Sequence, residues 1–186
     1  KALIVPLVIE QILSIAVGAA DTMMVSSAGE AAVSAVSLVD NVFVLLINLF
    51  AALATGGAVI SGQYLGRRRP DVAQKAAEQL ILFTAVFSVL IMALTYFFRS
   101  FILNVVFGKI EADVMSGCTT YLMIVAASIP FIALYNTGAA LFRAMGDSRT
   151  AMFTALFMNG INLVGNSILI FGLRMGVAGA AIPTLI

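Results

Sequence analysis

QLILFTAVFSVLIMALTYFF, residues 79–98, is a run of twenty residues that holds no charged side chain. An α-helix needs about 20 apolar residues to cross the hydrocarbon core of a bilayer. The 186-residue chain around this run is 62% hydrophobic and 10% charged, with a mean hydropathy of +1.10. Soluble domains are about half apolar and about a quarter charged. The composition therefore excludes a soluble enzyme and predicts an all-α membrane protein.

Further apolar runs on both sides predict a bundle of six transmembrane helices, which forms one domain over residues 1–186. The predicted spans are residues 2–25, 31–62, 79–98, 114–141, 150–171 and 177–186, the last of them truncated. We expect Asp71–Glu78 to form a surface helix that leads into the third span, after Pro70 at its first position. Pro130 is expected to interrupt the fourth span. Because the chain starts and stops inside apolar runs, we expect it to be a piece of a longer membrane protein.

The composition also excludes most kinds of chemical site. The chain has no histidine and one cysteine, Cys118, so histidine-ligated metals and internal disulfides are ruled out. A net charge of +1 supplies no attractive field for a nucleic acid. We therefore expect no enzymatic activity, no cofactor and no nucleic-acid partner.

Basic residues are divided unequally between the two sides of the predicted bundle. One side collects seven of them, namely Lys1, Arg67, Arg68, Arg69, Lys75, Arg143 and Arg149. The other side collects three, namely Arg99, Lys109 and Arg174. Loops rich in lysine and arginine stay in the cytoplasm. The division predicts a cytoplasmic N-terminus, and it explains the three consecutive arginines better than binding of lipid headgroups or nucleic acid does.

Two carboxylates lie inside the first predicted span. Glu10 and Asp21 are eleven residues apart, which at 100° per residue places them on nearly the same face of a helix. Ionised side chains inside a membrane face a bundle interior or water and are candidates for function. The alternative is that each lies near a membrane boundary and is simply solvated.

Amide side chains form a second polar stripe. Asn159, Asn162 and Asn166 share one face of the fifth span, and they can either hold helices together or offer oxygen atoms to a small cation. The second span poses the same alternatives with Asp40, Asn41 and Asn48. The candidates for lining a polar cavity are Glu10, Gln11, Asp40, Asn41, Asn48 and Asn159.

The order of these motifs resembles the multidrug and toxic compound extrusion (MATE) family of transporters. The matching motifs are Pro6…Glu10-Gln11…Asp21-Thr22, Gly66 before the basic loop, Arg143-Ala-Met-Gly-Asp-Ser-Arg-Thr150, Asn162 with Asn166, and Gly176-Val-Ala-Gly-Ala-Ala. The resemblance implies that the chain is the N-terminal six-helix lobe of a twelve-helix transporter with pseudo-two-fold symmetry. Its partners would be the lipid bilayer and the C-terminal lobe of the same protein.

The resemblance also implies a function, namely secondary active efflux of organic cations and amphipathic drugs by antiport with Na⁺ or H⁺ through alternating access. It assigns ion coupling to Asp21, Asn162, Asn166 and Thr184, with Asp21 and Asn162 as Na⁺ ligands if sodium is the ion. Pro6 would be the point at which the first helix bends. Many members carry an aspartate where this chain has Asn166, so the coupling ion stays open. The expected location is the cell membrane, in bacteria the cytoplasmic membrane, with several spans.

Two other functions compete with this one. A flippase for lipid-linked oligosaccharides, from the same superfamily, would carry more cationic residues in its cavity to hold a pyrophosphate. The charges inside the predicted spans are acidic, which favours a cationic cargo. A membrane scaffold that transports nothing would not need acidic residues and an amide stripe inside its spans.

Overall fold

The computed structural model describes residues 4–108, 110–173 and 175–185, and these ranges are helical apart from short connections. The helices are α1 (Ile4–Ser26), α2 (Glu30–Gly66), α3 (Pro70–Phe97), α4 (Arg99–Phe101), α5 (Ala112–Ala144), α6 (Ser148–Ser167) and α7 (Gly176–Leu185). Two π-helical segments, η1 (Ile102–Val106) and η2 (Ile168–Gly172), follow α4 and α6. Lys1, Lys109, Arg174 and the side chain of Pro6 lie outside the described part, so the roles predicted for them gain no structural detail.

The predicted all-α membrane fold is confirmed. Within the described ranges, α1, α2, α3, α5 and α6 together with η2 are long and apolar enough to cross a membrane, whereas α7 has ten residues. Several bounds differ from those expected. α2 continues to Gly66, α3 runs without a break from Pro70 through the stretch expected to be a surface helix leading into the third span, and α5 continues through Pro130.

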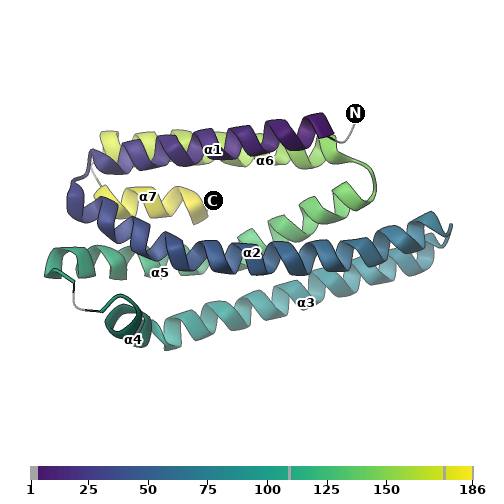
Figure 1. The fold of residues 1–186 in the computed structure, drawn as a ribbon, viewed down its shortest axis with the longest axis horizontal. Coiled ribbons are helices and arrows are strands. Elements are labelled where there is room, and N and C mark those ends of the chain that lie inside the picture. The colour runs from purple at the N-terminus through teal and green to yellow at the C-terminus, as the bar shows by residue number, and fades with distance from the viewer. Residues whose placement is uncertain (1–3, 109, 174, 186) are drawn as a thin grey trace.

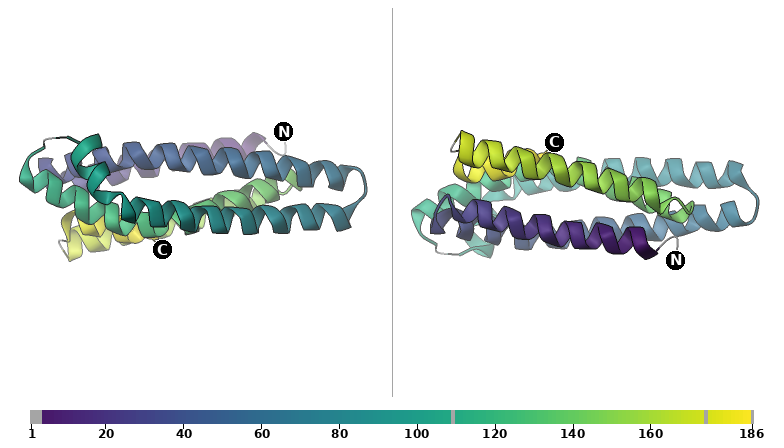
Figure 2. Two further views of the ribbon diagram at one scale, coloured as in Figure 1. Left: turned by 90° about the horizontal axis from the view of Figure 1, so that it is seen from below. Right: turned by 90° about the horizontal axis from the view of Figure 1, so that it is seen from above.

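The helices form two layers (Figure 1). α2, α3 and α5 pack together in one layer, and α1 lies beside α6 in the other, with α7 between α6 and α5. In the view from above, the two layers overlap, and α1 and α6 run side by side in front of the other helices (Figure 2). Large apolar side chains on the outer faces, such as Leu45, Leu82 and Phe157, are exposed, as expected for contact with lipid.

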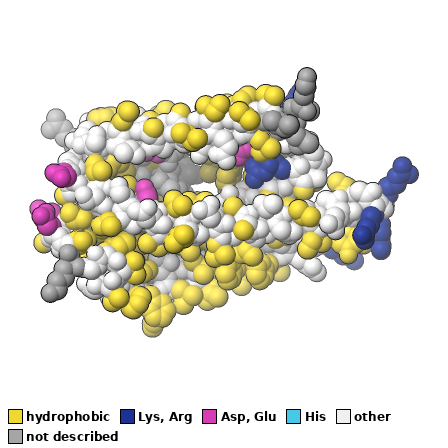
Figure 3. Space-filling model, viewed as in Figure 1, with side chains coloured by type: hydrophobic (Ala, Val, Ile, Leu, Met, Phe, Trp, Pro, Cys, Tyr) yellow, Lys and Arg dark blue, Asp and Glu magenta, His cyan; other side chains and the backbone are white. Residues whose placement is uncertain are grey.

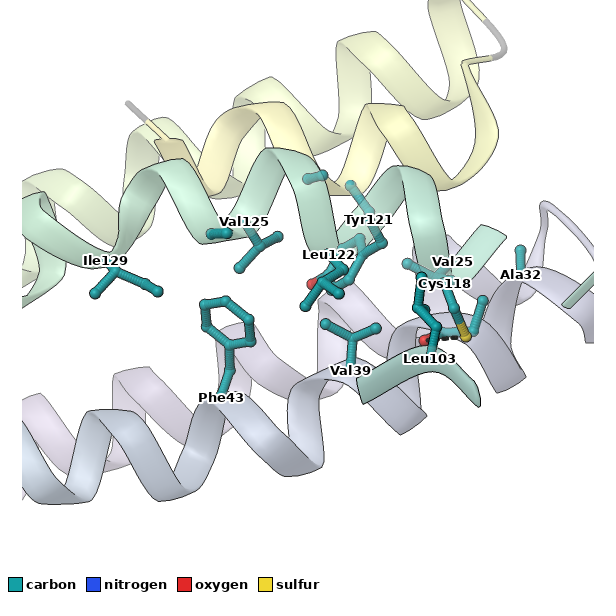
Figure 4. Close-up of a cluster of buried hydrophobic side chains, with 14 of the residues drawn as sticks. Val25, Ala32, Val39, Phe43, Leu103, Cys118, Tyr121, Leu122, Val125 and Ile129 are labelled. Carbon is teal, nitrogen blue, oxygen red and sulfur yellow. Dashed lines mark hydrogen bonds between the residues drawn. The ribbon is translucent and has the colours of Figure 1, made fainter. Parts of the chain in front are cut away.

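α5 is the central helix, and the main apolar core lies on it. Phe43 and Val39 of α2 point toward Leu122 and Val125 of α5, and all four side chains are at most 4% exposed (Figure 4). α5 packs closely against α2, α3 and α7. The polar side chains on α5 therefore have fixed positions relative to the α1–α6 layer.

The connection between α5 and α6 is built by a glycine and a helix cap. Gly146 has a φ of 85°, a conformation that costs glycine little. Asp147 then caps α6, since its Oδ1 accepts a hydrogen bond from the backbone N–H of Thr150 at 3.1 Å. The Thr150 hydroxyl also donates to Asp147 Oδ2 at 2.6 Å. These bonds hold the pKa of Asp147 below its ordinary value of 3.8.

The two ends of the bundle differ in charge. The start of α1, the α2–α3 turn and the α5–α6 connection lie at the same end (Figure 1). This end carries Arg67, Arg68, Arg69, Arg143 and Arg149. Acidic side chains gather at the opposite end, where Figure 3 shows them on the face it draws. Successive connections between the long helices therefore alternate between the two ends of the bundle, as the count of loop charges assumed.

Candidate functional site

Three predicted site residues form a hydrogen-bonded chain between the two helices of the α1–α6 layer. The amide Nδ2 of Asn166 donates to Asp21 Oδ1 at 2.7 Å and to Asn162 Oδ1 at 2.9 Å. Asp21 and Asn162 are half-buried, whereas Asn166 is 2% exposed. The spacing that placed the asparagines on one face of a helix thus brings Asn166 to the carboxylate of α1 and Asn162 to the amide of Asn166.

The carbonyl oxygen of Asn166 has no hydrogen-bond partner among the described residues, although it is fully buried. A buried acceptor without a partner costs about 1–3 kcal/mol. This carbonyl oxygen belongs to the amide that donates to Asp21, and it lies among carboxylate, amide and hydroxyl oxygens. Oxygen ligands of this kind suit a small hard cation, and a carboxylate beside an acceptor equally suits a proton.

A cavity of about 140 Å³ surrounds Asp21 and is shared by both layers. Asp40 of α2 and Thr184 of α7 also line it, together with Asn166 and Tyr121. The hydroxyl of Tyr121, on α5, donates to Asp40 Oδ1 at 3.0 Å. The cavity therefore holds two carboxylates from different helices, each accepting one hydrogen bond from a side chain.

A second cavity, of about 400 Å³, lies nearer the basic end. Its walls contain predicted residues from three helices, namely Glu10, Gln11, Asn159, Asn162 and Thr184. A hollow between α1 and α2 is visible on the face drawn in Figure 3, with acidic side chains at its edge. Thr184 lines both cavities, and Asn162 of the second is bonded to Asn166 of the first. Polar side chains thus connect the two spaces.

A close contact between α6 and α7 sets the position of Thr184. A Cβ atom on Gly165 would lie 2.9 Å from the Cβ of Pro183, so only glycine permits this approach. Pro183 and Thr184 are neighbours in α7, and Gly165 precedes Asn166. The contact therefore holds Thr184 beside the hydrogen-bonded chain.

Not all predicted residues meet at the two cavities. Asn41 and Asn48 are exposed and line neither cavity, and Asn41 donates to the carbonyl of Ser37 in its own helix. Conversely, sequence reasoning missed Tyr121, because a single tyrosine in an apolar span carries no periodic signal. It also assigned Arg143 only to a loop, whereas the Arg143 guanidinium pairs with Glu10 at 3.2 Å.

Comparisons with known proteins show the family of the chain. The MatE family model matches residues 6–168. The chain is 33% identical over 185 residues to the uncharacterized transporter YisQ of Bacillus subtilis (strain 168), covering 97% of this chain and 40% of YisQ. It is 26% identical over 188 residues to the probable multidrug resistance protein NorM of Thermotoga maritima, covering 99% of this chain and 40% of NorM.

A solved structure shows the same likeness in three dimensions. The crystal structure of MATE in complex with MaL6 matches with a TM-score of 0.94 and 26% identity, covering 99% of this chain and 40% of that chain. The chain thus spans about 40% of the length of the relatives it matches, as one lobe of a larger transporter does.

Proposed function

The chain belongs to the MatE family, whose members are transporters and not enzymes, and from this membership we propose that the full protein exports cationic drugs in exchange for Na⁺ or H⁺. Relatives named as multidrug resistance and multidrug export proteins support drug efflux as the activity. The lobe described here would supply the ion site and one wall of the path for the drug.

One observation carries the proposal. A carboxylate, Asp21, is held by an amide whose own carbonyl oxygen is buried and unpaired among the described residues. Buried polar groups are nearly always paired, so a partner for this oxygen is expected in the adjoining cavity of about 140 Å³, as a water molecule or as a visiting ion. An ion that visits the site and leaves it accounts for both the carboxylate and the unpaired oxygen.

The same geometry suggests how the ion acts. Asn166 presents its N–H donors to Asp21, and those donors would repel a cation at the carboxylate. Rotation of the amide by about 180° would offer the carbonyl oxygen to Na⁺, or to a proton on Asp21. Either event breaks the bond from Asn166 to Asn162, which lines the larger cavity. Ion binding at Asp21 would thereby alter the wall of the space proposed for the drug.

Coupling requires that the ion bind the two conformations of the lobe with different affinity. Neutralising Asp21 removes a charge from the smaller cavity and favours closer packing of the two layers. The drug then leaves toward the outside, and the ion escapes inward when the charge is restored. Thr184, which lines both cavities, and Asn162 assist in this scheme, and Pro6 is the point at which α1 would bend.

The charge of the larger cavity favours an organic cation over the pyrophosphate-linked cargo of a flippase. Glu10, which pairs with Arg143 outside the lining, is the one charged residue among the described side chains that line it, and it is acidic. The orientation follows from the basic end of the bundle, which we place in the cytoplasm together with the N-terminus.

The test is transport by the full-length protein in liposomes, with ethidium as the cationic probe. An imposed Na⁺ gradient, an imposed proton gradient and no gradient are compared at matched protein content. Ethidium movement driven by one of the two gradients is the expected result. Movement that ignores both gradients would contradict antiport, and specific flipping of a pyrophosphate lipid would favour the flippase.

A further inference from the structure

The ion pair between Glu10 and Arg143 links helices from different layers at the wall of the larger cavity, to which Glu10 belongs. Arg143 lies in the last turn of α5, and Glu10 lies on α1. α1 packs chiefly on α6 and touches α2 and α7. The pair therefore ties α1 directly to α5 at the basic end.

The geometry of the pair is that of a replaceable contact. One guanidinium nitrogen, Nη1, donates to both carboxylate oxygens, at 3.2 and 3.5 Å. Strong pairs of arginine and carboxylate use two parallel bonds of about 2.7–2.9 Å. The side chains of Arg143 and Glu10 are 29% and 20% exposed, so water and solutes reach them. Such pairs are weak and exchange easily.

The carboxylate of Glu10 also belongs to the wall of a cavity large enough for a small molecule. The cavity of about 400 Å³ falls in the range of about 300–1,000 Å³ that is usual for ligand pockets. Tyr135, Met158 and Asn159 add aromatic, thioether and amide groups to its wall. Glu10 is the acidic group of this wall to which a cation would bind.

We propose that the guanidinium of Arg143 competes with a cationic substrate for the Glu10 carboxylate. The substrate must displace Arg143 in order to bind in the larger cavity. The inference rests on the proposed export of organic cations. Binding then exchanges one cation for another at Glu10, so the carboxylate is not left unpaired in either state. Displacement of Arg143 also releases the tie between α1 and α5, which links occupancy of the cavity to movement of α1.

A competitor produces effects of opposite sign when the two partners are changed. Arg143→Gln should lower the dissociation constant of ethidium about fivefold, which is about 1 kcal/mol at 1.4 kcal/mol for each tenfold change. Arg143→Lys should lower it about twofold, because a single ammonium group forms a weaker pair than a guanidinium. Glu10→Gln should raise it about tenfold. An arginine with a purely structural role would weaken binding when removed.

The experiment measures ethidium binding to the purified full-length protein by fluorescence anisotropy, with thermal unfolding to verify each variant. Arg149→Gln is the matched control, because Arg149 is exposed in the first turn of α6, across the short connection from Arg143, and also carries one positive charge. We expect it to leave the dissociation constant within twofold of the wild-type value. In the Glu10→Gln background, Arg143→Gln should change the dissociation constant less than twofold, since no carboxylate is left to compete for.

Three results would overturn the inference alone, given that the wild-type protein binds ethidium. They are an unchanged or raised dissociation constant in both Arg143 variants, an equal gain in Arg149→Gln, and a fivefold gain that persists in the Glu10→Gln background. The last two would mean that arginine acts through its general field. If the wild-type protein binds no ethidium, both the proposed cationic cargo and this inference fail.

Discussion

Replacing Asp21 with asparagine separates the coupling role of this carboxylate from its structural role. Asparagine keeps an oxygen in the place of Asp21 Oδ1, so Asn166 can still donate its hydrogen bond. The bond loses its charge assistance, a cost of about 1 kcal/mol. Removing an ionised group from the membrane offsets this, since such a group costs about 2.5–3.5 kcal/mol at the bilayer centre. The difference of about 1.5–2.5 kcal/mol favours asparagine, so we expect the melting temperature not to fall.

Ion binding should respond far more strongly than stability. A unit charge about 4 Å from a cation contributes about 4 kcal/mol at an effective dielectric constant of about 20, which suits a half-buried group. Loss of this term corresponds to a loss of about 10³-fold in ion affinity, at 1.36 kcal/mol for each tenfold change. Ethidium transport driven by the ion gradient should accordingly fall to the level of empty liposomes.

The assay compares Asp21→Asn with Asp113→Asn in the full-length protein at matched expression. Asp113 is exposed in the first turn of α5, and its variant should transport as the wild type does. Wild-type transport by Asp21→Asn would refute the assignment of Asp21, and attention would pass to Asp40. A melting temperature that falls by more than about 10 °C would instead mean that the carboxylate is needed for folding.

Three further outcomes are expected. A cysteine placed at Arg68 should react with an impermeant thiol reagent only from the cytoplasmic side, and one placed at Glu111 only from the outer side. The reverse pattern would refute the orientation. Asp147→Ala should lower the melting temperature at pH 7, and the gap to wild type should narrow as the pH falls below 3.8. The reason is that a depressed pKa contributes stability above the ordinary value and loses it as the folded-state group is protonated, so a gap at pH 2 as large as that at pH 7 would contradict a charge-assisted cap. Gly165→Ala should destabilise by about 1 kcal/mol, because the new methyl group meets a proline of α7. Gly160→Ala, where the methyl group meets no atom within 4 Å, should stabilise by up to about 1 kcal/mol, and equal effects of the two would argue against the close contact.

Helical spacing carried most of what could be predicted. The apolar runs gave the membrane-spanning helices, and the positions of Asn162 and Asn166 gave one face of α6. The ends of the helices were less predictable, because a polar residue such as Asp71 is tolerated in a helix that extends beyond the membrane. Nothing between Pro70 and Phe97 breaks the helix, so the polar and apolar parts join.

Contacts between distant parts of the chain could not be predicted from spacing. Tyr121 and Asp40 are 81 positions apart, and their bond depends on how α5 packs against α2. Arg143 and Glu10 are 133 positions apart, and the long arginine side chain crosses from α5 to α1. The sequence alone gives no reason to pair any of these four residues with its partner, and only the fold shows which side chains meet.

The rate at which the buried thiol of Cys118 reacts can report how often the core of the chain opens. Its side chain is fully buried, and its Sγ donates to the carbonyl of Ala35 at 3.7 Å, across the contact between α5 and α2. A thiol reagent can reach it only when these helices separate, so the reaction rate equals the rate for a free thiol multiplied by the fraction of time spent open. A thiol reagent would therefore modify an introduced, exposed cysteine before Cys118. The slower modification of Cys118 would measure how often the contact between α2 and α5 opens.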